Sequence, residues 1–397
     1  MKHISFTVTY IAIALAIAIA AGCLVASPTS SQEFQDGDPV SIGAFRLLHS
    51  DVLGEDRMLL VCAPKDYEDS GMSYPVLYVL YGDQIRGYFA EAVHIMDRLS
   101  EEGSIPKMIV VGVANVDRYR DLSAVGRPGR PSGIEPFLRF VTEELFPFVE
   151  KEYRTKNYRV LIGPQAGAEF GFYTLARRPG LFDAYILENP FRSSEVYDVL
   201  TEMMTTLLDE GLPSFTFIQV TASDRAGPLD TTVQVGYMHT FDDLVEEKDP
   251  NNITLITHYI KDSKEFLPLL KLREGLRELF RKYRFPEDRE VRVLTDITSY
   301  YSELSEVFGF EIDIPEMTLY MKADKLSKMG MDNSAREILE FLIEIYPTSV
   351  SGHWGLANLH REMGNRELAL EHYRKCVELM PNMRPAIQWI ERLEAGE

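Results

Sequence analysis

The chain has 397 residues, of which 45% are hydrophobic and 26% are charged, a composition typical of globular proteins. This length is enough for about two to three domains. The formal net charge of −20 argues against a nucleic-acid partner and against electrostatic binding to an anionic membrane. Apart from Cys23, the cysteines are Cys62 and Cys376, which we expect to be small core residues rather than parts of a disulfide framework.

The first 23 residues predict an export signal. Residues 4–22 are apolar and carry no charge behind Lys2, and a polar tract follows at 28–32, which fits a signal peptide better than a permanent span. The run Ala20-Ala21-Gly22-Cys23 resembles a bacterial lipobox and makes Cys23 the predicted lipidation site. Because Ala20 stands where that pattern prefers leucine, ordinary cleavage and an uncleaved anchor remain alternatives. Each alternative predicts an exported protein of the cell envelope, periplasm or exterior, which touches a membrane only through its N-terminal lipid or signal anchor.

Residues 24–40 form a polar linker, and residues 41–284 read as an α/β domain. Apolar runs typical of buried strands alternate there with amphipathic, helix-like segments. The expected strands are 46–50, 58–63, 75–81, 107–114, 158–163, 184–188, 215–221 and 253–260, and the expected helices are 87–99, 134–153, 167–177, 195–208 and 266–283. Near-continuous apolar strands separated by helices predict a doubly wound, mostly parallel sheet with both faces covered. The first two strands read as an antiparallel opening hairpin.

Residues 285–315 connect this domain to a helical tail, 316–397, which contains an internal repeat. Five pairs of residues stand 34 positions apart: Tyr320 and Trp354, Ala323 and Ala357, Gly330 and Gly364, Ala335 and Ala369, and Pro347 and Pro381. This period resembles two tetratricopeptide repeats, 316–349 and 350–383, followed by a capping helix over 385–393. Lys322, Asn358 and Arg361 are candidates for a face that holds a protein partner. Docking on the α/β domain and dimerisation are equally open alternatives for a short array.

Residues 161–168 read Leu-Ile-Gly-Pro-Gln-Ala-Gly-Ala, which is the pattern of a nucleophile elbow with glutamine at the nucleophile position. In such an elbow the nucleophile stands on a sharp turn between a buried strand and a helix. Gly163 and Gly167 supply the two positions of close backbone approach. The amide of Gln165 cannot attack a carbonyl carbon as a serine hydroxyl does.

Residues 45–284 resemble the putative esterase family of α/β hydrolases, which includes esterase D and the enterochelin and ferri-siderophore esterases. The segments that carry the resemblance follow one another in the family's order: 74–83, 108–115, 117–122, 137–140, 143–148, 153–155 and 179–186. The resemblance implies an α/β-hydrolase fold and hydrolysis of carboxylic esters by a Ser-His-Asp triad.

The same resemblance places two residues without triad chemistry at triad positions. Gln165 stands at the serine and Lys264 at the histidine, while Asp224 is a tolerable match for the acid. A lysine exposed to solvent is protonated at pH 7 and cannot accept a proton from a nucleophile. Loss of a nucleophile or base typically costs about 10⁴–10⁶-fold in acyl transfer. We therefore expect a catalytically inactive esterase-like domain.

What would remain of the catalytic machinery is an oxyanion-hole-like set of backbone amides at Ala166, Gly82 and Asp83. An active ester hydrolase with a relocated nucleophile is the alternative interpretation. The residues weighed for that rescue are His94, His239, His258, Ser132, Ser193 and Ser194, and each also fits an ordinary structural role.

The crevice at the carboxyl ends of the strands persists in this fold whether or not it catalyses, so it can hold a small anionic or ester ligand. Gln165 either hydrogen-bonds such a ligand or fills the old nucleophile space. Arg118 and Arg120, with Arg127 and Arg130 nearby, offer anion binding, or they pair with Asp117 and Asp121. The sequence indicates no cofactor and no metal ion. A purely structural role, with the repeats mediating assembly, is a third interpretation.

Overall fold

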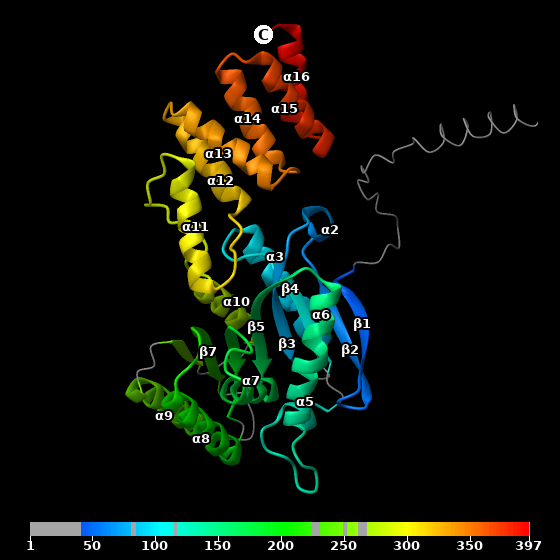
Figure 1. Ribbon diagram of the computed structural model, residues 1–397, viewed down its shortest axis with the longest axis vertical. Coiled ribbons are helices and arrows are strands. Elements are labelled where there is room, and N and C mark those ends of the chain that lie inside the picture. Colours follow the sequence, from blue (N-terminus) through cyan, green and yellow to red (C-terminus); the bar gives the residue numbers. More distant parts are fainter. Residues whose placement is uncertain are drawn as a thin grey trace, which may run out of the picture. The chain divides into compact units, whose positions relative to one another are not determined.

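The computed structural model describes residues 41–80, 85–114, 117–191, 193–223, 231–248, 252–260 and 268–396. Five predicted site residues lie outside this part of the chain: Cys23, Gly82, Asp83, Asp224 and Lys264. The described part forms a sheet covered by helices, followed by a helical region (Figure 1).

The sheet has eight strands in the order β1-β2-β4-β3-β5-β6-β7-β8. The strands are β1 (Ala44–Ser50), β2 (Glu55–Cys62), β3 (Tyr74–Leu80), β4 (Ile109–Val113), β5 (Thr155–Pro164), β6 (Ala184–Glu188), β7 (Thr216–Ser223) and β8 (Ile253–Ile260). The pairs β1–β2 and β2–β4 are antiparallel, and every later pair is parallel. This arrangement confirms the predicted opening hairpin and the doubly wound, α/β-hydrolase class.

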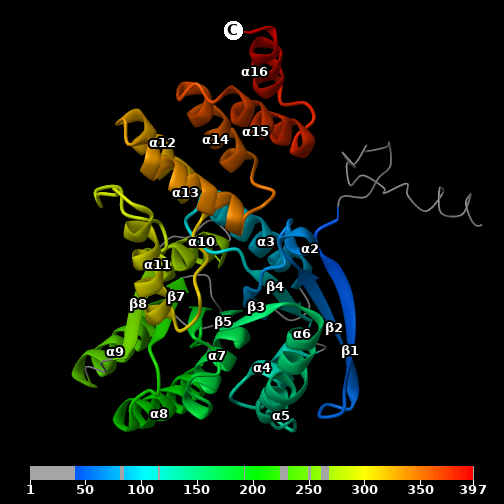
Figure 2. The ribbon, with the colours of Figure 1, turned by 45° about the horizontal axis from the view of Figure 1, so that its top comes forward.

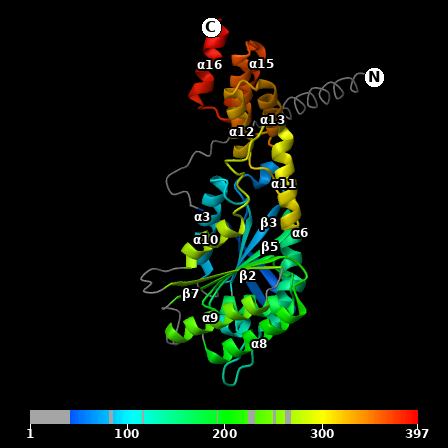
Figure 3. The same ribbon diagram turned by 90° about the vertical axis from the view of Figure 1, so that its left-hand side faces the viewer.

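Helices cover both faces of the sheet, as Figure 3 shows for α8 and α9 on one side and α3 and α10 on the other. The helices of the α/β part are α2 (Tyr67–Ser70), α3 (Ile85–Glu101), α4 (Arg118–Leu122), α5 (Ile134–Phe140), α6 (Phe146–Glu152), α7 (Ala166–Arg177), α8 (Ser194–Glu210), α9 (Thr231–Lys248) and α10 (Pro268–Leu279). The apolar run of β3 is continuous because its successive side chains point to opposite faces of the sheet and both faces are covered. Tyr78 packs with the α5–α9 side, while Leu77 and Val79 pack with α3 and α10.

The stretch predicted as one helix over 134–153 is divided. A π-helical turn, Val141–Leu145, separates α5 from α6, and Pro147 follows within the first turn of α6. Proline has no N–H to donate to the carbonyl four residues earlier, so a regular helix cannot run through it unchanged. Pro147 therefore accounts for the interruption.

The helical region begins with α11 (Leu294–Phe308), a helix within the predicted connector, and continues with five helices at regular intervals (Figure 2). These are α12 (Glu316–Lys328), α13 (Asp332–Ile345), α14 (Val350–Glu362), α15 (Arg366–Leu379) and α16 (Arg384–Ala395). Helices α12, α14 and α16 start at 316, 350 and 384, two intervals of 34 residues. The structure thus has repeated helical hairpins at the predicted period, and their assignment as tetratricopeptide repeats stays a prediction.

The registered residue pairs have physical roles in these hairpins. Gly330 and Gly364 have φ of 75° and 76° in the turns after α12 and α14, where a left-handed backbone favours glycine. The paired alanines Ala323, Ala335, Ala357 and Ala369 are fully buried. Small buried residues let neighbouring helices approach closely, so the repeat in the sequence follows from packing.

The first hairpin shares its core with the α/β part. Leu319 and Leu342 belong to the same apolar cluster as Leu77 and Val79 of β3. The last helices have a separate small core, which includes Tyr373, Cys376 and Leu393. Docking on the α/β part, one of the alternatives for the helical region, is therefore present for its first hairpin.

Candidate functional site

The predicted elbow forms between β5 and α7. Gln165 has φ 54° and ψ −116°, a backbone conformation that is rare for a residue with a side chain. A Cβ on Gly163 would lie 2.3 Å from the carbonyl oxygen of Gly167, and a Cβ on Gly167 would lie 2.6 Å from that of Leu80. Both glycines are thus required by close backbone approach, as the sequence predicts. The chain keeps the strained turn of a nucleophile elbow with an amide side chain in place of the nucleophile.

Hydrogen bonds on both sides hold the elbow. The backbone N–H of Gln165 donates to the backbone carbonyl of Glu188 at 2.6 Å. The backbone carbonyl of Gln165 accepts from the backbone N–H groups of Ala168 and Glu169 in the first turn of α7. The buried carboxylate of Glu169 accepts from the Ser123 hydroxyl at 2.8 Å and from the Ala124 amide at 3.2 Å. The turn is therefore fixed to β6 and to the segment that follows α4.

The carboxyl ends of β5 to β8 are neighbours. Next to the contact between the elbow and β6, the backbone N–H of Asn189 donates to the backbone carbonyl of Thr221 on β7 at 2.7 Å. Thr221 in turn is in register with His258 of β8. The predicted acid Asp224 comes directly after β7, and Lys264 follows β8 by four residues, both outside the described residues. The strands that precede the three triad positions are thus brought to one edge of the sheet, as in the family pattern.

Glu188 is a site residue that the sequence analysis missed. It is buried at the end of β6, and its Oε1 accepts from the Asn189 side-chain amide at 3.1 Å. Burial raises the pKa of Glu188 to about 8, and the Tyr88 hydroxyl only partly offsets this effect. Glu188 is therefore mostly uncharged at neutral pH. Its signal in the sequence is an ionisable residue at the end of an otherwise apolar strand.

The side chains weighed for a relocated nucleophile or base have structural roles or lie away from the elbow. Ser132 donates to the Ser123 carbonyl at 2.6 Å, and Ser193 caps α8 by accepting from the Val196 amide. His258 lies on β8, where burial lowers its pKa. The remaining three, Ser194, His94 and His239, are exposed on α8, α3 and α9. Nothing in this arrangement places one of the six at an elbow.

The arginine-rich segment predicted to bind an anion forms ion pairs with the chain itself. The fully buried Arg57 of β2 lies 2.8 Å from Asp121, which is also buried. Arg120 donates to Asp121 at 2.7 Å and to Glu55 at 2.6 Å, and these hydrogen bonds raise the pKa of its guanidinium. Arg120 thus matches the alternative of pairing within the protein.

Arg118 and Arg127, in the same arginine-rich segment as Arg120, stack on an aromatic ring. The guanidinium groups of Arg118 and Arg127 lie 5.0 Å and 4.0 Å from the ring centroid of Tyr119. Arg130 lies 3.9 Å from Asp117, whose carboxylate also caps α4. Anion binding by Arg118 stays a prediction.

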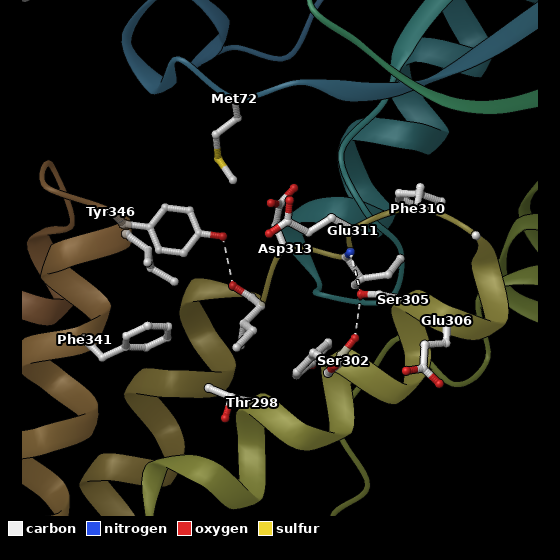
Figure 4. A pocket seen from close by; sticks show the side chains of 15 residues that line it. Met72, Thr298, Ser302, Ser305, Glu306, Phe310, Glu311, Asp313, Phe341 and Tyr346 are labelled. Atoms are coloured by element: carbon white, nitrogen blue, oxygen red, sulfur yellow. Dashed lines mark hydrogen bonds between the residues drawn. The ribbon is translucent and has the colours of Figure 1, made fainter.

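A pocket of about 720 Å³ lies where α11, α13 and the segment 309–314 meet, below Met72 (Figure 4). Its wall is largely apolar, with Phe310, Phe341 and Tyr346, and its charged lining residues are Glu306, Glu311 and Asp313. The Asp313 carboxylate is paired with Lys156 at 2.6 Å. This pocket does not include the elbow. Among the described residues no His, Cys, Asp and Glu side chains are grouped to hold a metal ion.

The candidate partner-binding residues of the helical region also contact the chain itself. The Tyr373 hydroxyl donates to Asn358 Oδ1 at 2.7 Å, and the Arg361 guanidinium lies 4.1 Å from the Trp389 ring centroid. Lys322 Nζ lies 4.6 Å from the Phe285 ring centroid. A smaller pocket of about 240 Å³ between α12 and α14 is lined in part by Asn358 and Arg361, so these two border a groove. In the described part of the chain no helix is long and apolar enough to span a membrane.

Comparison with known proteins finds a family similarity in the α/β part. Residues 50–203 match the family described as "Putative esterase". This segment is thus similar to that esterase family. The ferri-bacillibactin esterase BesA of Bacillus subtilis is 29% identical over 137 residues, which are 30% of this chain and 47% of the relative. The chain thus spans about half the length of this curated relative.

Solved structures agree on the fold. An IroE-like serine hydrolase from Shewanella oneidensis has a TM-score of 0.63 at 21% identity and covers 76% of this chain and 99% of its own. An uncharacterised protein from Capnocytophaga ochracea has a TM-score of 0.58 at 18% identity and covers 89% of this chain and 99% of its own. At these identities the likeness establishes the fold alone. The esterase segment lies within the predicted α/β domain and contains the elbow.

Proposed function

We propose that this protein is an exported esterase-family protein without serine-hydrolase activity, which binds a ligand at the carboxyl edge of its sheet. The observation that carries the proposal is Gln165 in the strained elbow conformation, φ 54° and ψ −116°. Such strain costs on the order of 1–3 kcal/mol and persists where the surrounding structure enforces it. The scaffold that would present a nucleophile is thus kept, while the side chain has no nucleophilic oxygen.

The resemblance supports the loss of the base as well. A lysine exposed to solvent at position 264 would carry a proton at neutral pH and could not take one from a hydroxyl. Glu188, the buried acid next to the elbow, does not replace the base, because its pKa of about 8 leaves it mostly protonated at pH 7. At the usual position of the base, this chain therefore offers no group that can take the proton from a nucleophile and return it to the leaving group.

The ligand class follows from the family. The BesA relative is named for an ester of a ferri-siderophore, ferri-bacillibactin. Our proposal assigns to this chain the binding of such a ferric siderophore ester without hydrolysis, with the helical region as a docking surface for a protein partner. The N-terminal signal, lipidated at Cys23, would place the protein in the cell envelope.

Turnover and active-site labelling test the loss of catalysis. The wild type should neither hydrolyse short-chain aryl esters and thioesters nor react with a fluorophosphonate. Gln165→Ser alone should also stay inactive, because Lys264 remains at the base position. Gln165→Ser with Lys264→His should gain measurable turnover, and Gln165→Asn with Lys264→His is the matched control without a hydroxyl. A fluorophosphonate-labelled serine in the wild type would instead support the alternative, an active ester hydrolase with a relocated nucleophile.

Ligand binding is measured separately, by equilibrium dialysis with ferri-bacillibactin. Retention of the intact ester by the wild type supports the binding role. No retention, together with no turnover, would remove the ligand assignment and leave a structural role, which concentration-dependent oligomers of the full chain would indicate.

A further inference from the structure

Three of the eight histidines in the chain gather in the last helical hairpin. His353 and His360 lie on α14 and His372 lies on α15. His353 Nδ1 and His372 Nδ1 are 3.1 Å apart, and the rings of His360 and His372 are parallel with centroids 5.8 Å apart. His353 and His360 are buried, and His372 is partly buried. The cluster therefore occupies the seam between two helices.

The contact between the two Nδ1 atoms needs one imidazole to donate and the other to accept. A neutral imidazole has one donor and one acceptor nitrogen, whereas an imidazolium has two donors. If both rings are protonated, two N–H groups and two positive charges face each other at this distance. Uptake of protons by both rings thus removes a hydrogen bond and adds repulsion between α14 and α15.

We propose that these three histidines make the α14–α15 hairpin an acid-sensitive element, which is closed at neutral pH and loosens when the cluster takes up protons. Helix α14 also lines the groove that contains Asn358 and Arg361. Loosening of the hairpin changes the surface that the helical region offers to a partner. This inference does not depend on what the esterase-family part binds.

The surroundings favour neutral rings. Burial lowers the pKa of all three histidines, and burial together with the charges of the other two rings brings that of His372 to about 4. The charged groups that face the cluster are of both signs: Glu371, Lys375 and Glu378 on α15, and Arg336 and Glu340 on α13. The pKa of these histidines is lower in the folded chain than the unfolded value of 6.5. The stability that the neutral rings give the hairpin is therefore present above pH 6.5 and is lost as the pH falls toward 4.

The two tryptophans of the chain report on this region alone. Trp354 lies on α14 and Trp389 on α16, with ring centroids 5.5 Å and 6.4 Å from that of Tyr373 on α15. Both tryptophan rings pack against the small apolar cluster of the last helices, which includes Tyr373 and Cys376. Tryptophan emission therefore follows the hairpin without a signal from the α/β part.

The experiment is a titration of tryptophan emission from pH 8 to pH 4 on the full chain, with a chelator present to exclude metal binding. In the wild type we expect a reversible red shift with a midpoint between pH 6.5 and 4, and a local unfolding equilibrium that rises about 10- to 100-fold. The triple variant His353→Gln, His360→Gln, His372→Gln should lose this transition. His94→Gln, an exposed histidine on α3, is the matched control and should behave as the wild type.

Two results would overturn the proposal: constant emission in the wild type down to pH 4, or the same transition in the triple variant. If the emission of the triple variant already differs from the wild type at pH 8, His372→Gln alone is used, and its midpoint should move to lower pH. Hydrogen exchange separates local from global change. At the midpoint, peptides of α14 and α15 should lose protection while β5 keeps it, and simultaneous loss in β5 would also contradict the proposal.

Discussion

Gln165 shows how a residue can keep a backbone conformation after losing the chemistry that uses it. The turn around it depends on two neighbours without side chains. Gly163 faces the carbonyl of Gly167, and Gly167 faces the carbonyl of Leu80 at the end of β3. Backbone atoms of a helix or a strand cannot move aside as the end of a flexible side chain can. The elbow is therefore maintained by packing, independently of the side chain at position 165.

A methyl group at the elbow should therefore destabilise the protein. Gly167→Ala would place Cβ 2.6 Å from the Leu80 oxygen, and we expect it to lower the free energy of unfolding by about 2–3 kcal/mol in urea denaturation. Gly236→Ala in α9 is the control, because open space surrounds that position. It should raise stability by up to about 1 kcal/mol, since alanine favours helix over glycine. Equal effects of the two variants would argue against a tightly packed elbow.

At the scale of elements, a buried ion pair ties the antiparallel opening of the sheet to α4. Arg57 on β2 and Asp121 on α4 are both fully buried, and Glu55 and Arg120 extend the pair toward the surface. The Arg57 guanidinium also lies 5.6 Å from the ring centroid of Phe137 on α5. Charges at such a depth are tolerated because each has a partner.

Removal of one partner should therefore be costly. We expect Asp121→Ala to lower the free energy of unfolding by about 3 kcal/mol, because Arg57 is left buried with less compensation. The double variant Arg57→Met, Asp121→Leu should lose less than Asp121→Ala alone. Glu143→Ala breaks the exposed pair Arg139–Glu143 on the same side of the sheet and should leave the denaturation midpoint unchanged. A midpoint for Asp121→Ala equal to that of Glu143→Ala would show that the buried pair contributes little.

At the scale of the whole molecule, the predicted connector is an interface rather than a spacer. Phe310 packs against Tyr158 of β5 with ring centroids 4.7 Å apart, and Asp313 pairs with Lys156 of the same strand. The hydroxyl of Tyr346, directly after α13, donates to the Ile314 carbonyl at 2.8 Å. Residues 309–314 thus join the first helical hairpin to the sheet.

The α/β part and the first hairpin should consequently unfold together. We expect Phe310→Ala to destabilise both by about 3–5 kcal/mol, because a large buried ring is removed. Scanning calorimetry should show a lower temperature for the main transition. Val307→Ala, an exposed apolar residue on α11, is the control and should leave this temperature unchanged. Two well-separated transitions in the wild type, one for the sheet and one for the hairpin, would contradict a shared core.

The sequence by itself determined the features that depend on local pattern. The apolar runs predicted the strands, the glycines predicted the elbow, and the 34-residue period predicted the spacing of the helical hairpins, since each of these is governed by neighbours along the chain. Only the tertiary structure decided the rest. The burial of Glu188, the pairing of Arg120 with Glu55, the docking by Phe310 and the histidine cluster each depend on contacts between different elements of the fold. Burial and hydrogen bonding between such residues depend on how the elements pack, and no local pattern encodes that packing.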